Sequence, residues 1–173
     1  MKQKRFYNST QHLCLAAMFM ALTVILSMSV LSIPVPGGHL YMNDIPICTA
    51  AIIFDPITAM VVGGVGAFLG DLIFYPTPMF VSLLTHGLQA AAISLLAHRR
   101  NGQLSDAISG VAVGAVIMVV GYSLGRAFVY ATPEAAWLKL PFQILQAAVG
   151  AAVSVVLCYG FKLRSAAENI LNK

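Results

Sequence analysis

Hydrogen-bonding and charged side chains recur at helical spacing inside apolar stretches of this sequence. Spacings of i, i+4 and i+7 place side chains on one face of a helix. The three stripes are Ser82, His86 and Gln89; Tyr122 and Arg126; and Lys139, Gln143 and Gln146. These residue types bind small polar molecules, and a histidine near a carboxylate such as Asp71 is also a pairing used in general base catalysis.

Arg126 is the most constrained of these residues. Residues 110–120 and 127–131 on either side of it are mostly apolar. A guanidinium is costly in the hydrocarbon of a bilayer, so it has to face protein or water. Asp71 shares its helical face with Gly64 and Ala67, and such small residues pack against protein rather than lipid.

The composition defines the class of protein. The chain has 173 residues, of which 59% are hydrophobic, and its mean hydropathy is +0.84. These values exclude a soluble globular protein and predict a polytopic helical membrane protein. The apolar runs are continuous rather than alternating, which excludes a β-barrel. An ATPase or large catalytic domain would have to come from another chain.

Several other classes of function are disfavoured. The net charge of +4 comes from basic residues that flank the apolar stretches, so we expect no nucleic-acid partner. Cys14, Cys48 and Cys158 are scattered and lack metal-ligand spacing, so we expect reduced packing residues, no metal site and no cofactor. Residues 13–33 are too long for a signal peptide and lack a cleavage site, so we expect a retained span.

We predict one domain, residues 1–173, made of six transmembrane helices. Asp55-Pro56, Asn101-Gly102 and Thr132-Pro133 are breaks between them, because proline and glycine interrupt helices. The predicted helices cover residues 11–33, 41–54, 57–75, 79–98, 106–131 and 136–163.

Charge predicts the orientation. Eight of the ten basic residues flank the predicted helices or lie at the termini, and the positive-inside rule places all of them in the cytoplasm. They are Lys2, Lys4, Arg5, Arg99, Arg100, Lys162, Arg164 and Lys173. Four spans before Arg99 satisfy this rule, whereas three would put Arg99 and Arg100 outside. Both termini are therefore expected in the cytoplasm.

This orientation places the polar stripes at one depth, in the outer halves of the helices. The inner halves of the helices carry almost no polar residues of this kind. The sequence therefore predicts a pocket that opens outward. The first outer loop, around Gly37-Gly38, is expected to cover it as a movable lid. The candidate substrate-binding residues are His39, Tyr41, Asn43, Asp71, His86, Gln89, Tyr122, Arg126, Gln143 and Gln146.

Each of these residues also has a purely structural interpretation. Arg126 could reach outward to lipid headgroups, and Asp71 could be a hydrated helix end. Lys139 is expected to be an interfacial anchor rather than a ligand contact, with Trp137 and Tyr130 in the aromatic belt. Gln143 and Gln146 could form hydrogen bonds between helices, and His86 could be a hydrogen-bonded histidine of the core. Small-residue patterns such as Gly66-x-x-x-Gly70 are expected to pack helices together.

Three segments of the chain resemble a known family. They are GGHLYMNDIP at residues 37–46, AAIIFDP at 50–56 and GGVGAFLGDL at 63–72. These segments, the length and the six predicted spans are similar to the substrate-binding (S) component of energy-coupling-factor (ECF) vitamin transporters. One difference is Asp55-Pro56, where many relatives have Gly-Pro, and it lies in a cytoplasmic turn.

The resemblance implies a six-helix protein of the prokaryotic plasma membrane that binds a vitamin or precursor at its outer side. It also implies a complex with a membrane coupling subunit and two cytoplasmic ATPase subunits. Family members contact the coupling subunit through a small-x-x-x-small motif in the first helix, which Ala17 and Ala21 match here. The S component is thought to topple in the membrane, and ATP hydrolysis by the partners would reset it.

The ligand expected from the polar residues is a small, ring-containing micronutrient. Asp71 and Arg126 would bind its charged or hydroxyl groups, and Tyr41 or Tyr122 would stack on its ring. A vitamin B6 form or a hydroxymethylpyrimidine-type thiamine precursor is the preferred hypothesis; pantothenate, riboflavin, queuine-like bases and cobalamin are alternatives.

Two other classes compete with this hypothesis. One is a small intramembrane enzyme that uses His86 and Asp71 as a general base pair. The other is an oligomeric channel, which the apolar inner halves of the helices disfavour.

Overall fold

The computed structural model describes residues 10–28, 32–100 and 102–171. Within these residues the chain is almost entirely helical, apart from one short hairpin. The elements are α1 (Thr10–Leu26), β1 (Ile33–Val35), β2 (Gly38–Leu40), α2 (Asp44–Ile53), α3 (Pro56–Phe74), α4 (Met79–Ala97), α5 (Leu104–Gly125) continued by the π-helix η2 (Arg126–Tyr130), α6 (Pro133–Val155) continued by the π-helix η3 (Val156–Gly160), and α7 (Leu163–Leu171).

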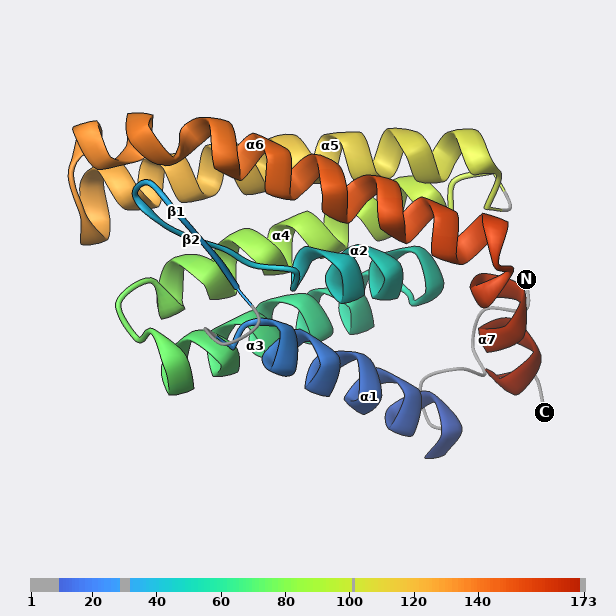
Figure 1. The fold of residues 1–173 in the computed structure, drawn as a ribbon. Helices are drawn as coiled ribbons and strands as arrows, with labels where there is room; N and C mark the ends of the chain where they lie inside the picture. Colours follow the sequence, from blue (N-terminus) through green and yellow to red (C-terminus); the bar gives the residue numbers. More distant parts are fainter. Residues whose placement is uncertain (1–9, 29–31, 101, 172–173) are drawn as a thin grey trace.

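Helix α2 is the centre of the bundle. It contacts α1, α3, α4 and α6, and these helices surround it (Figure 1). Almost every residue of α2 is buried, with Ile47 and Ile52 fully inaccessible to solvent. An apolar helix that is buried on all sides needs no amphipathic pattern, because every face contacts protein.

The long helices have the length and composition of membrane-spanning segments. Four segments are long and apolar enough to cross a bilayer: α3, α4, α5 with η2, and α6 with η3. Their outward faces expose large apolar side chains such as Leu84 and Val116, which suit contact with lipid. The apolar helices α1 and α2 are shorter, with 17 and 10 residues.

The predicted end of the first helix was wrong. It was expected to continue to residue 33, but α1 ends at Leu26, and Ile33–Val35 pairs with Gly38–Leu40 in an antiparallel hairpin. Proline at 34 and 36 disfavours continued helix. Gly37 and Gly38 have φ of 80° and 140°, values that glycine adopts without strain, so the chain turns there.

The last helix was also predicted incompletely. It was expected to end near residue 163, whereas η3 ends at Gly160 and a separate helix, α7, follows. Lys162 has φ of 56°, which breaks the helical path. Ala167 of α7 is buried, and Leu163 and Leu171 pack against the core, so α7 is amphipathic and covers one end of the bundle.

The two ends of the bundle differ in character. The hairpin and the connection between α5 and α6 lie at one end, whereas the start of α1, the connection between α4 and α5, and α7 lie at the other (Figure 1). The second end carries Arg99, Arg100, Lys162 and Arg164. The other four basic residues that were predicted to be cytoplasmic, at positions 2, 4, 5 and 173, lie outside the described residues.

Glycines allow close helix contacts, and Gly66 of the predicted Gly66-x-x-x-Gly70 pattern lies against Thr23 of α1. A Cβ atom at Gly64 would lie 2.8 Å from the carbonyl oxygen of Leu83 in α4. A Cβ atom at Gly150 of α6 would lie 2.5 Å from Cβ of Asp44, at the start of α2. The absence of a side chain at Gly150 therefore sets the separation of α6 from the central helix.

We expect Gly150→Ala to lower the thermal stability of the purified protein in detergent. Overpacking against Asp44 costs about 1–3 kcal/mol, which exceeds the gain in helix propensity of about 1 kcal/mol. Gly160→Ala is the matched control, because its Cβ would have only an ordinary contact of 3.5 Å with Val156. An unchanged Tm for Gly150→Ala would contradict this account of the α2–α6 contact.

Candidate ligand-binding site

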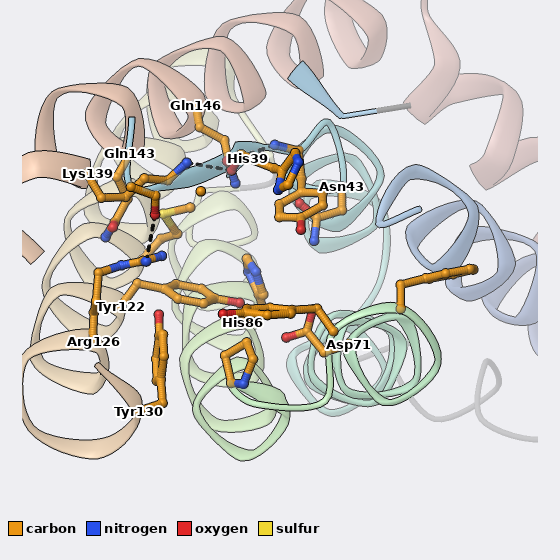
Figure 2. A pocket seen from close by; sticks show the side chains of 17 residues that line it. His39, Asn43, Asp71, His86, Tyr122, Arg126, Tyr130, Lys139, Gln143 and Gln146 are labelled. Carbon is orange, nitrogen blue, oxygen red and sulfur yellow. Dashed lines mark hydrogen bonds between the residues drawn. The ribbon is translucent and has the colours of Figure 1, made fainter. Parts of the chain in front are cut away.

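A cavity of about 270 Å³ lies beneath the hairpin, at the end of the bundle away from α7 (Figure 2). Nine of the ten predicted site residues line it, contributed by the hairpin, the start of α2 and helices α3 to α6. They are His39, Tyr41, Asn43, Asp71, His86, Tyr122, Arg126, Gln143 and Gln146. The tenth, Gln89, lies behind the wall and is 1% exposed.

Sequence reasoning missed several lining residues. Lys139, expected to be an interfacial anchor, lines the cavity and is 4% exposed. Tyr130, assigned to the aromatic belt, also lines it, whereas Trp137 is exposed as expected. The position of Lys139 in the same stripe as Gln143 and Gln146 was the signal that could have identified it. Phe74, Tyr75, Pro78 and Met118 also line the cavity and carried no such signal.

A buried carboxylate organises the inner wall. Asp44, the first residue of α2, is 1% exposed and accepts hydrogen bonds from Gln89 Nε2 at 3.0 Å and from Gln146 Nε2 at 2.7 Å. The positive end of the α2 dipole also favours a negative charge here. Asp44 thereby joins α4 and α6 to the central helix, a role that the sequence did not reveal.

The two glutamines continue this network in opposite directions. Gln146 Oε1 accepts from the backbone N–H of Tyr41 at 3.0 Å, next to the hairpin. Gln89 Oε1 lies 2.6 Å from Nδ1 of His86. Because the Gln89 amide group donates to Asp44, its oxygen is an acceptor, so His86 Nδ1 carries a proton. Both the nitrogen and the oxygen of each side-chain amide are therefore hydrogen-bonded. Gln89 and Gln146 thus fix the positions of the residues around the cavity.

A second hydrogen-bonded chain links α5, α4 and α3 beside the cavity. The Tyr122 hydroxyl donates to Ser82 Oγ at 2.5 Å, and Ser82 donates to a carboxylate oxygen of Asp71. The rings of Tyr122 and His86 meet edge to face with 5.3 Å between their centroids. This chain fixes Asp71 at the cavity and orients the Tyr122 ring.

Two cationic side chains hold the hairpin over the cavity. Arg126 Nη1 donates to the carbonyl oxygen of Gly37 at 3.0 Å, and Lys139 Nζ donates to that of His39 at 2.5 Å. The Arg126 guanidinium also lies over the ring of Tyr130, 5.3 Å from its centroid. Arg126 thus points to the hairpin and the cavity rather than to the lipid headgroups.

The geometry does not support a catalytic dyad. His86 bonds to Gln89, whereas Asp71 bonds to Ser82. Each of these candidate catalytic groups is therefore engaged with a different partner, as expected for groups that shape a binding site.

Comparison with known proteins identifies the class. The sequence profile of the family described as "ECF-type riboflavin transporter, S component" matches residues 7–163. The chain therefore belongs to this family of membrane-embedded vitamin transporter subunits, and the resemblance noted in the sequence is confirmed. Members work with a membrane coupling subunit and ATPases, and they are not themselves enzymes.

Individual relatives agree with this assignment. The thiamine precursor transporter HmpT of Lactococcus lactis subsp. cremoris is 31% identical over 87% of this chain and 87% of its own. An uncharacterized protein in the gap 3′ region of Pyrococcus woesei is 29% identical over 83% of this chain and 96% of its own. The S component of a bacterial ECF transporter matches with a TM-score of 0.72, over 87% of this chain and 94% of its own, at 19% identity, which shows a shared fold.

We predict that Asp44→Ala strongly destabilises the protein. Two buried amide groups would lose their acceptor, at a cost of about 1–3 kcal/mol each. Glu134→Ala is the matched control, because Glu134 is also an acidic residue in a first helical turn but is exposed. Thermal unfolding in detergent measures the difference, and equal Tm values for the two variants would show that Asp44 does not organise the site.

Proposed function

We propose that this protein is the S component for a small, ring-containing vitamin precursor of the hydroxymethylpyrimidine type. The carrying observation is the single-ring scale of the cavity, about 270 Å³, combined with its polar wall of Asp71, Asn43, His86 and Arg126. The likeness to a thiamine precursor transporter supports the same ligand class.

The size of the cavity favours this ligand over riboflavin. Ligand sites in proteins typically measure about 300–1,000 Å³, so this cavity, at about 270 Å³, lies just below that range. A vitamin B6 form, which is also a single substituted ring, is the second candidate for the same reason. The three-ring system of riboflavin, with its sugar chain, would require the hairpin to move away from its present position.

We propose that the cavity faces the outside of the cell. The described basic residues cluster at the opposite end of the bundle, which the positive-inside rule assigns to the cytoplasm. Helix α2, about 15 Å long, is too short to cross a hydrocarbon core of about 30 Å alone. In this proposal α2 and the hairpin together cross the membrane, and with α1 they complete six passes with both termini inside.

We further propose that α1 binds the coupling subunit of an ATP-driven complex. Ala17 and Ala21 are exposed on one face of α1, beside the exposed side chains of Leu13 and Met18. Small residues on an exposed apolar face allow another helix to approach closely. ATP hydrolysis by two cytoplasmic subunits would then drive release of the ligand to the inside.

Ligand identity can be tested with the purified protein. Native mass spectrometry and titration calorimetry against a vitamin panel should show tight binding of the amino-hydroxymethyl-methylpyrimidine and weaker or no binding of riboflavin. The panel should include pyridoxine, pantothenate, cobalamin and a queuine-like base. Preferential binding of riboflavin would overturn the proposed ligand while leaving the class of protein intact.

Assembly can be tested by co-purification with the coupling subunit and ATPases of the same cell. Ala17→Leu with Ala21→Leu should abolish co-purification while leaving ligand binding unchanged, because the enlarged side chains lie far from the cavity. Ala112→Leu is the matched control, since Ala112 is an exposed alanine on α5. Retention of the complex by the double variant would place the interface elsewhere.

A further inference from the structure

We infer that Asp71 selects the ligand by accepting a hydrogen bond from an amino group on its ring, and that Ser82 positions Asp71 from behind the cavity wall. The inference rests on the proposed function and specifies which group of the pyrimidine is recognised. Ser82 is then a determinant of specificity that does not itself touch the ligand.

Asp71 is a carboxylate at the cavity without a cationic partner. It lines the cavity and is only partly buried. Asp71 takes part in none of the salt bridges that the described residues form. Arg126 and Lys139, the cations at the same cavity, donate instead to carbonyl oxygens of the hairpin. A carboxylate removed from water is costly unless hydrogen bonds compensate it, so Asp71 requires donors.

A buried serine occupies one oxygen of Asp71. Ser82 of α4 is 0% exposed, does not line the cavity, and donates to Oδ2 of Asp71. Because the single proton of Ser82 is used there, its Oγ accepts from the Tyr122 hydroxyl, at 2.5 Å. Both hydroxyl protons therefore point along one chain that ends at Asp71. Ser82 thus fixes the carboxylate of α3 relative to α5.

The other oxygen of Asp71, Oδ1, is accessible. It makes no hydrogen bond to the described residues, and it is not one of their buried side-chain atoms without a partner. Figure 2 shows Asp71 beside His86 and Tyr122, among the side chains that line the cavity. A carboxylate oxygen only accepts hydrogen bonds, so a ligand at this position has to supply a donor.

The amino group of an aminopyrimidine meets this requirement. Its nitrogen lone pair is delocalised into the ring, so the group donates hydrogen bonds and does not accept them. The hydroxymethyl group on the adjacent ring carbon can donate or accept, so it does not depend on a carboxylate. A hydrogen bond to an ionised acceptor is roughly twice as strong as one between neutral groups. The bond to Asp71 therefore accounts for the discrimination between pyrimidines with and without the amino group.

Titration calorimetry of the purified protein measures this discrimination. The amino-hydroxymethyl-methylpyrimidine is compared with an analogue in which methyl replaces the amino group. The wild-type protein should bind the analogue about 10–100-fold more weakly, as expected for the loss of a hydrogen bond to a charged group. Asp71→Leu should weaken binding of the parent pyrimidine and bring the ratio of the two dissociation constants close to one.

Ser82→Ala tests the positioning role. It should lower the ratio about threefold, because Asp71 keeps its charge but loses the donor that fixes it. Ser94→Ala is the matched control and should leave the ratio unchanged. Ser94 is an equally buried serine of α4, and its hydroxyl donates to the carbonyl oxygen of Phe54, away from the cavity. A purely structural role for Ser82 would instead weaken both ligands equally and preserve the ratio.

An unchanged ratio in Asp71→Leu would overturn Asp71 as the acceptor of the amino group, and an unchanged ratio in Ser82→Ala would overturn the positioning role. Asp71→Asn and Ser82→Cys, which keep the shape of each side chain but weaken its hydrogen bonding, replace any variant that does not fold and should lower the ratio in the same direction. Failure of the parent pyrimidine to bind the wild-type protein would overturn the proposed function itself.

Discussion

The hydrogen bonds to the buried carboxylate of Asp44 are the interaction on which the rest of the structure depends. Asp44 is the first residue of the central helix and accepts hydrogen bonds from Gln89 of α4 and Gln146 of α6. Burying a charge is costly unless hydrogen bonds compensate it, so these three side chains have to stay together. The closeness of Gly150 to Asp44 allows α6 to reach that position. The site is thus built around a polar centre inside an otherwise apolar bundle.

The cavity and the hairpin that covers it share residues, so the two are physically connected. Gln146 bonds to both Asp44 and the backbone of Tyr41, and Arg126, which also lines the cavity, bonds to the hairpin. A ligand that contacts Arg126 would therefore restrict the hairpin through the same guanidinium.

Much of the site could be predicted from spacing alone. The stripes that contain His86, Arg126 and Gln143 are regular helices, so their side chains project at intervals that are visible in the sequence. The lining residues that were missed are of two kinds. Tyr130 and Lys139 have side chains that also suit a membrane interface, and Met118 is apolar like the lipid-facing residues around it. For Tyr130 and Met118 nothing local distinguishes these alternatives, because the difference lies in which neighbour each side chain meets. Lys139 is the exception, since it shares a helical stripe with Gln143 and Gln146.

The sequence by itself determined the class of protein, the long apolar helices and the helical faces that carry polar residues, because these depend on composition and local periodicity. Only the tertiary structure decided that α1 stops at Leu26, that residues 33–40 form a hairpin over the cavity, and that Asp44 of α2 bonds to α4 and α6. The partners of Asp44 are 45 and 102 residues away in the chain. Contacts at such separations come from the packing of whole helices, which local sequence patterns do not specify.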